Sequence, residues 1–128
     1  MNFPNGTIFR VFRDVLPGAN IVLFHFPCET NLSWKKMARL AKGQGLKLTT
    51  GKDLLKLCLK SPNLPADFGF IGRSAMLVVA TKVLVGRGIK LAQGVLFEGG
   101  QQNVMSIEVA NCGPDSGHND WFAYIKPK

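Results

Sequence analysis

The sequence predicts a mainly β protein, a small β-barrel or sandwich with one short inserted α-helix near residues 33–42. Two observations predict this fold. Short apolar runs rich in β-branched and aromatic residues recur along the chain. Turn-forming clusters such as Pro17-Gly18 and Gly99-Gly100 separate them, a spacing typical of barrels and sandwiches. At 128 residues with no linker, we expect a single domain spanning residues 1–128.

Each predicted strand is an apolar or alternating run bounded by turn-forming residues. In chain order, the predicted strands are residues 8–12, 21–26, 68–71, 75–80, 83–85, 95–97, 104–110 and 121–125. No apolar run approaches the ~20 residues of a membrane-spanning helix. We therefore expect no association with a membrane.

A helix is predicted over residues 33–42 because Trp34, Met37 and Ala41 share one face and basic residues occupy the other. Ser33 or Asn31 could cap its start. Gly43 suits the left-handed position past its end. The apolar stripe is interpreted as a contact with the core.

Residues 50–60 fit two structures. Leu55, Leu57 and Leu59 alternate as in a strand, whereas a helix would begin behind a Thr50 cap. Two basic helices in succession would resemble a helix-turn-helix unit. The connection over residues 43–49 is longer than the usual tight turn, which favours the strand, and the helix remains the alternative.

The protein is strongly basic, and its charged residues are unevenly distributed along the chain. Sixteen Lys and Arg against eight Asp and Glu give a net charge of +8. The basic segment, residues 35–60, holds eight basic residues and one acid, Asp53. Such a segment favours phosphate-bearing partners, although a solvated face that keeps the protein soluble is the alternative. The candidate nucleic-acid-binding residues are Lys35, Lys36, Arg39, Lys42 and Lys47.

Neither a disulfide framework nor a metal site is predicted. Cys28, Cys58 and Cys112 are odd in number and form no Cys-x-x-Cys pair. His25 lies in an apolar strand, where a hydrogen-bonded structural role is expected. The N-terminus lacks a secretory pattern. We expect an intracellular protein, in the cytoplasm or nucleus, with no cofactor and no metal.

The second half of the chain contains motifs in a familiar order. A Leu64-Pro65 turn leads into an Arg73-Ser74 pair, and residues 94–100 follow as a Gly-Val-Leu-Phe-Glu-Gly-Gly hairpin. Asn111 then ends a strand, and residues 121–127 form a last one. Residues 63–127 thereby resemble the deoxyuridine triphosphatase (dUTPase) family. The resemblance implies a β-barrel, phosphate contacts from Arg73 and Ser74, and assembly as a trimer.

The departures from that family concern its acids. Residues 17–23 lack the metal-associated aspartate, and the hairpin aspartate position reads Phe97 or Glu98. The sequence ends at Lys128, before the family's Gly-Asp strand. Triphosphate hydrolysis needs charge neutralisation and an acid that positions water. The resemblance therefore implies a noncatalytic interaction or regulatory protein, of the kind DNA viruses reuse.

Two alternatives remain open. A basic nucleic-acid-binding β domain, such as a viral structural or RNA-binding protein, would use the basic segment. An active enzyme would need acids from unexpected positions, such as Asp67, Glu98 or Asp115. The partner would be a protein for the noncatalytic dUTPase-like protein and a nucleic acid for the basic β domain.

Overall fold

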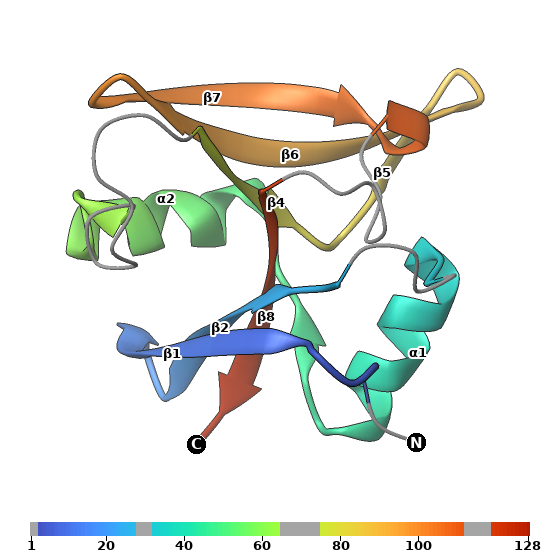
Figure 1. The fold of residues 1–128 in the computed structure, drawn as a ribbon, viewed down its shortest axis with the longest axis horizontal. Helices are drawn as coiled ribbons and strands as arrows, with labels where there is room; N and C mark the ends of the chain where they lie inside the picture. Colours follow the sequence, from blue (N-terminus) through green and yellow to red (C-terminus); the bar gives the residue numbers. More distant parts are fainter. Residues whose placement is uncertain (1–2, 28–31, 65–74, 112–118) are drawn as a thin grey trace.

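A computed structural model describes residues 3–27, 32–64, 75–111 and 119–128 (Figure 1). These residues form strands, two α-helices and one 3₁₀ turn, so the mainly β prediction is confirmed. The elements in chain order are β1 (Ile8–Leu16), β2 (Ala19–His25), α1 (Trp34–Gly43), β3 (Lys47–Leu48), α2 (Gly51–Lys60), β4 (Met76–Ala80), β5 (Leu84–Gly86), β6 (Ile89–Glu98), β7 (Gln101–Glu108), η1 (Val109–Asn111) and β8 (Asp120–Pro127).

The strands form one open mixed sheet of eight strands in the order β1-β2-β8-β4-β6-β5. β7 pairs with the other edge of β6, and β3 pairs with β8 beside β4. Only the pairing of β4 with β8 is parallel. The predicted closed barrel and two-sheet sandwich are therefore both wrong, because helices cover the sheet where a barrel or a second sheet would enclose it.

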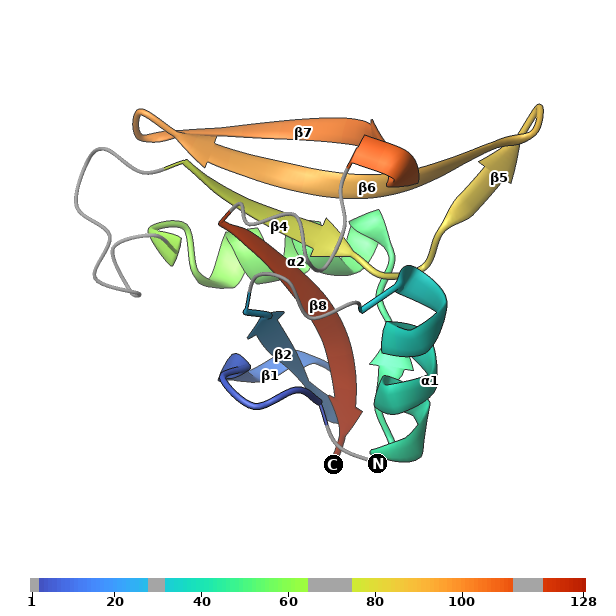
Figure 2. The ribbon, with the colours of Figure 1, turned by 45° about the vertical axis from the view of Figure 1, so that its right-hand side comes forward.

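The central strands bury both of their faces, which places the two helices on opposite sides of the sheet. On β8, Trp121 and Ala123 pack with α2, whereas Phe122 and Tyr124 pack with α1. β2 divides its side chains in the same way. Successive strand residues point to opposite faces, so this alternation follows from strand geometry. Figure 2 shows β8 running between the helices.

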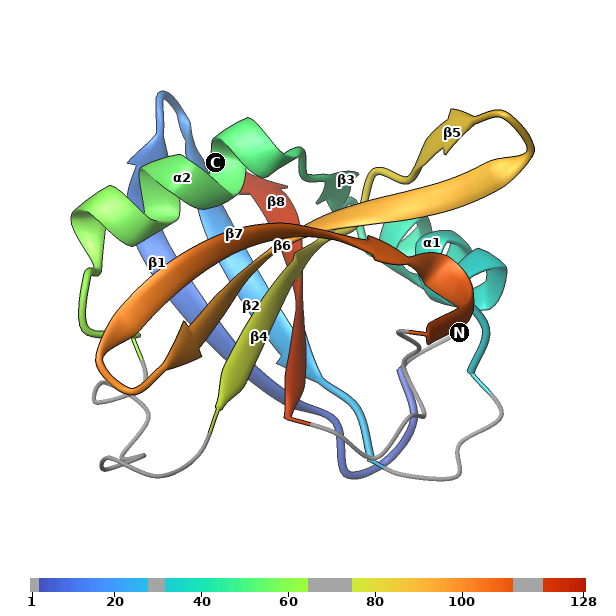
Figure 3. The same cartoon turned by 90° about the horizontal axis from the view of Figure 1, so that it is seen from above.

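The sheet curls around α2. This helix contacts β1, β4 and β6. Figure 1 shows it between the β6–β7 hairpin and the β1–β2 hairpin, and Figure 3 shows it crossing over β1 and β2. Its inward side chains Leu54 and Leu57 are at most 1% exposed. Apolar burial on this scale makes the α2 face a closed core.

Of the two structures considered for residues 50–60, the favoured strand is wrong and the helix is found, as α2. Thr50 and Asp53 form a capping box, each side chain accepting a hydrogen bond from the other's backbone N–H. The buried set is Leu54, Leu57 and Cys58, with helical spacing. The alternation of Leu55, Leu57 and Leu59 does not mark one buried face of a strand, because Leu59 is 84% exposed. The end of α1 also differs from expectation, since Gly45 rather than Gly43 has the positive φ.

Most of the predicted strands that the structure describes are found, with shifted ends. The prediction for residues 95–97 captured only part of β6, and residues 109–110 belong to η1 rather than β7. β3 was not predicted, and the predicted strand at residues 68–71 lies outside the described residues. Gly99 and Gly100 make the two-residue turn between β6 and β7, both with positive φ, as a type I′ turn requires.

Two buried threonines join β3 and β4 to β8. Their hydroxyls both donate to the Ala123 carbonyl, at 2.7 Å each. Each hydroxyl also accepts the backbone N–H of the other threonine, Thr49 at 3.1 Å and Thr81 at 3.2 Å. This threonine pair fills the gap where β4 ends and β3 begins along the same edge of β8. It also fixes the residue that precedes the cap of α2.

Candidate functional site

The residues predicted to contact phosphate, Arg73 and Ser74, lie outside the described residues. Asp67 and Asp115, two of the alternative acids, also lie outside them, and Glu98 is exposed at the end of β6. The hairpin in the resembling segment does form, but Gly-Gly hairpin turns occur in many β proteins. The described residues therefore leave the dUTPase-like site a prediction.

The outer face of α1 gathers four of the five predicted nucleic-acid-binding residues. Ser33 caps the helix by accepting a hydrogen bond from the Lys36 N–H at 3.1 Å. At the other end, Gly45 and Leu46 donate to the carbonyls of Lys42 and Ala41, which closes the helix with a Schellman motif. This helix turns its apolar stripe inward and leaves its cations in solvent.

We call this set of cations the α1 basic face. Its members are exposed and share the side of the helix opposite the buried stripe: Lys35, Lys36, Arg39 and Lys42. At 1.5 Å per residue they extend over about 10 Å of helix. None of them pairs with an acid among the described residues. The face therefore presents four uncompensated positive charges.

The basic segment is not one surface. Lys52, Lys56 and Lys60 lie on α2, across the sheet from α1. Lys60 is engaged, because its ammonium donates to the Asp14 carbonyl at 2.7 Å. The helix-turn-helix alternative is wrong for the same reason: β3 and a sheet separate the two helices.

Lys47 does not belong to the α1 basic face. It lies on β3, where its register partner is Ile125. By strand alternation, Ile125 shares the side of β8 that carries Trp121 and Ala123, which is the α2 side. Lys47 is exposed, but a ligand bound along α1 would not reach it without crossing the sheet edge.

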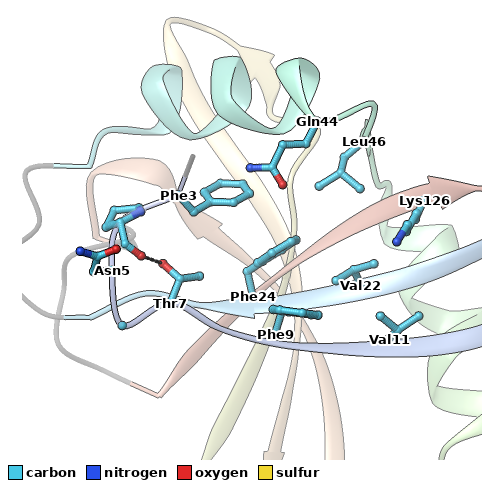
Figure 4. A pocket seen from close by; sticks show the side chains of 12 residues that line it. Phe3, Asn5, Thr7, Phe9, Val11, Val22, Phe24, Gln44, Leu46 and Lys126 are labelled. Atoms are coloured by element: carbon cyan, nitrogen blue, oxygen red, sulfur yellow. Dashed lines mark hydrogen bonds between the residues drawn. The ribbon is translucent and has the colours of Figure 1, made fainter. Parts of the chain in front are cut away.

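An apolar groove lies beside the end of α1, and sequence reasoning missed it. Its volume is about 460 Å³ (Figure 4). The N-terminal segment, β1, β2, the turn after α1 and β8 all contribute to its walls. We call this the aromatic groove; its lining residues are Phe3, Pro4, Asn5, Gly6, Thr7, Phe9, Val11, Val22, Phe24, Gln44, Leu46 and Lys126.

The exposed fraction of the aromatic side chains falls from Phe9 through Phe24 to Tyr124. Phe9 is 62% exposed, whereas Phe24 is 6% exposed, and their ring centroids are 6.0 Å apart. Phe3 packs against Phe24 at 4.7 Å. Below them, Tyr124 meets Phe24 edge-on at 5.7 Å. The buried rings hold Phe24 in place, while Phe9 remains open to the solvent.

Polar groups stand at the rim of this groove. Figure 4 shows Lys126 at one end, beyond Val11 and Val22, with Asn5 and Thr7 at the other. The Thr7 hydroxyl is already used, donating to the Pro4 carbonyl at 2.7 Å. The side-chain amide of Gln44 makes no hydrogen bond with another residue that the structure describes. The described lining thus combines apolar walls with one cation, Lys126, and two side-chain amides, Asn5 and Gln44.

The buried titratable side chains Cys58 and Tyr124 pack in the core and do not line the groove. Burial raises the pKa of the Cys58 thiol to about 11, so the thiol is protonated at neutral pH and a poor nucleophile. Burial also raises the pKa of Tyr124, whose hydroxyl has no hydrogen-bond partner among the described residues. His25 Nδ1 lies 3.2 Å from the Asp120 carbonyl oxygen, in agreement with its predicted structural role.

In the described part of the chain, no three His, Cys, Asp or Glu side chains gather as a metal site would require. No helix there has the length and apolar character needed to span a membrane. Comparison of the chain with protein-family models, curated proteins and solved structures found no match. The candidate site therefore rests on its own geometry, the α1 basic face beside the aromatic groove.

Proposed function

We propose that the protein binds nucleic acid through the α1 basic face. The observation that carries the proposal is the arrangement of four exposed cations on one side of a ten-residue helix, none of them paired with an acid that the structure describes. Cations arranged in this way neutralise phosphates and release their counterions, which is the main source of nonspecific affinity for nucleic acids. The net charge of +8 adds long-range attraction.

The first test is charge reversal on α1. Lys35→Glu/Arg39→Glu should weaken binding of a labelled 12-nucleotide single strand roughly tenfold or more at ~50 mM salt. The slope of log affinity against log salt should fall by about 1.4, because two phosphate contacts are lost and each contributes about 0.7 on a single strand. Fluorescence anisotropy measures both quantities.

The matched control is Lys52→Glu/Lys56→Glu on α2. It removes the same charge from two exposed positions with the same spacing, but on the opposite side of the sheet. We expect a smaller loss of affinity and an unchanged salt slope. Equal losses for both variants would mean that net charge alone attracts the ligand. An unaltered protein that binds no oligonucleotide at ~50 mM salt would overturn the proposal.

A further inference from the structure

The ring of Phe9 lines the aromatic groove and is exposed to solvent. A large aromatic side chain at 62% exposure forgoes most of the free energy that burial would supply. Its neighbour Phe24 is fixed by packing, and the Phe9 ring lies beside it with the ring centroids 6.0 Å apart, so that the two rings form one aromatic wall. Val11, on the same face of β1, is 40% exposed and extends the wall. This wall offers apolar area to a flat ligand.

The groove has the dimensions and polarity of a small-ligand site. Such sites occupy roughly 300–1,000 Å³ and combine apolar walls with a few polar groups that set orientation. The 460 Å³ groove provides Lys126 for an anion and the Gln44 amide, which can donate and accept, for a polar ring edge. A planar heteroaromatic ring attached to a phosphate matches these groups.

We propose that the aromatic groove binds an unstacked base of a single-stranded nucleic acid, with the adjoining phosphate at Lys126. This inference rests on the proposed function, because α1 supplies the cations for neighbouring phosphates. Gln44 and Leu46, which line the groove, follow directly after α1. Any base can stack on an aromatic side chain, so this contact needs no particular nucleotide sequence. In a duplex the bases are paired and stacked on one another, so they cannot stack on the protein.

The proposal predicts single-strand preference and a specific role for the Phe9 ring. Phe9→Ala should weaken binding of an oligothymidylate 12-mer about 5- to 100-fold, which is the effect of losing one stacked base. Phe9→Leu should also lose affinity, whereas Phe9→Tyr should keep it, because the ring rather than the apolar area is required. Val104→Ala, which truncates a 69% exposed side chain on β7, is the control and should change nothing.

An abasic 12-mer separates this inference from the proposed function. It carries the same phosphates but no bases. The unaltered protein should therefore bind it more weakly than the thymidylate strand, and Phe9→Ala should not weaken its binding further. If Phe9→Ala binds both strands as the unaltered protein does, the groove proposal is overturned while binding by α1 stands. Tighter binding of a 12-base-pair duplex than of the single strand would also overturn it. If neither strand binds, both proposals fail. Thermal unfolding confirms that each variant is folded.

Discussion

The two faces of the sheet carry helices of the same length with exposed lysines, yet they differ in how completely they are covered. On the α2 face the curled sheet packs around the inner side of the helix, and Leu57 is fully buried. On the α1 face the helix covers β8 but leaves the end of the β1–β2 hairpin open, and Phe9 is exposed there. The curved sheet thus closes off a core on one face and leaves an apolar groove on the other.

The most severe test of this comparison is truncation in the closed core. Leu57→Ala should lower the free energy of unfolding by about 2–5 kcal/mol, because it opens a cavity that the surrounding sheet cannot fill. Leu59→Ala, on the same helix but exposed, should change it by less than about 0.5 kcal/mol. Urea unfolding measures both. Equal losses would show that α2 is not enclosed as described.

A smaller effect is expected from the threonine pair that anchors α2. Thr49→Val removes a hydroxyl that donates to the Ala123 carbonyl and accepts from the Thr81 N–H, so it should cost about 1–3 kcal/mol. Thr81→Val should cost a similar amount. Because the two side chains share one network, the double variant should lose less than the sum of the two. Strict additivity in urea unfolding would show that they act independently.

The smallest effect concerns pH and the Cys58 thiol. Its pKa is raised on folding to about 11, so the unfolded chain loses this proton first as pH rises. Stability from the buried thiol is complete below the unfolded pKa and declines as pH increases from about 9 to about 11. The stability difference between the unaltered protein and Cys58→Ala should therefore shrink over that range. Urea unfolding at pH 7 and pH 10.5 checks this, and Tyr124 cancels because both proteins contain it. A constant difference would contradict the expected burial of the thiol.

Local patterns were sufficient for part of this fold. The α1 helix was predicted from its stripe and cap, and most strands were predicted from apolar runs. α2 was missed because the long connection over residues 43–49 was taken to favour a strand, whereas the Thr50–Asp53 capping box is the stronger local constraint. β3 has two residues, too few to show a period. Such errors arise where tertiary packing decides the structure.

The candidate site divides in the same way. The cations of α1 follow from helical periodicity, and their exposure needs no long-range information. The aromatic groove could not be predicted, because Phe3, Gln44 and Lys126 come from segments that meet only in the folded sheet. The sequence does hold a partial signal for the groove. Phe9 and Val11 are two residues apart, so they place two apolar side chains on the same face of a predicted strand.

The position of β8 has a consequence for synthesis of the protein. This strand lies between β2 and β4 although it comes from residues 120–127. During translation, the β1–β2 hairpin and the β4–β6–β7 unit emerge with their inner edges unpaired. They join only after the ribosome has released residues 120–127. Until then, each edge is a template for pairing with other chains, so the complete sheet cannot form before β8 is available.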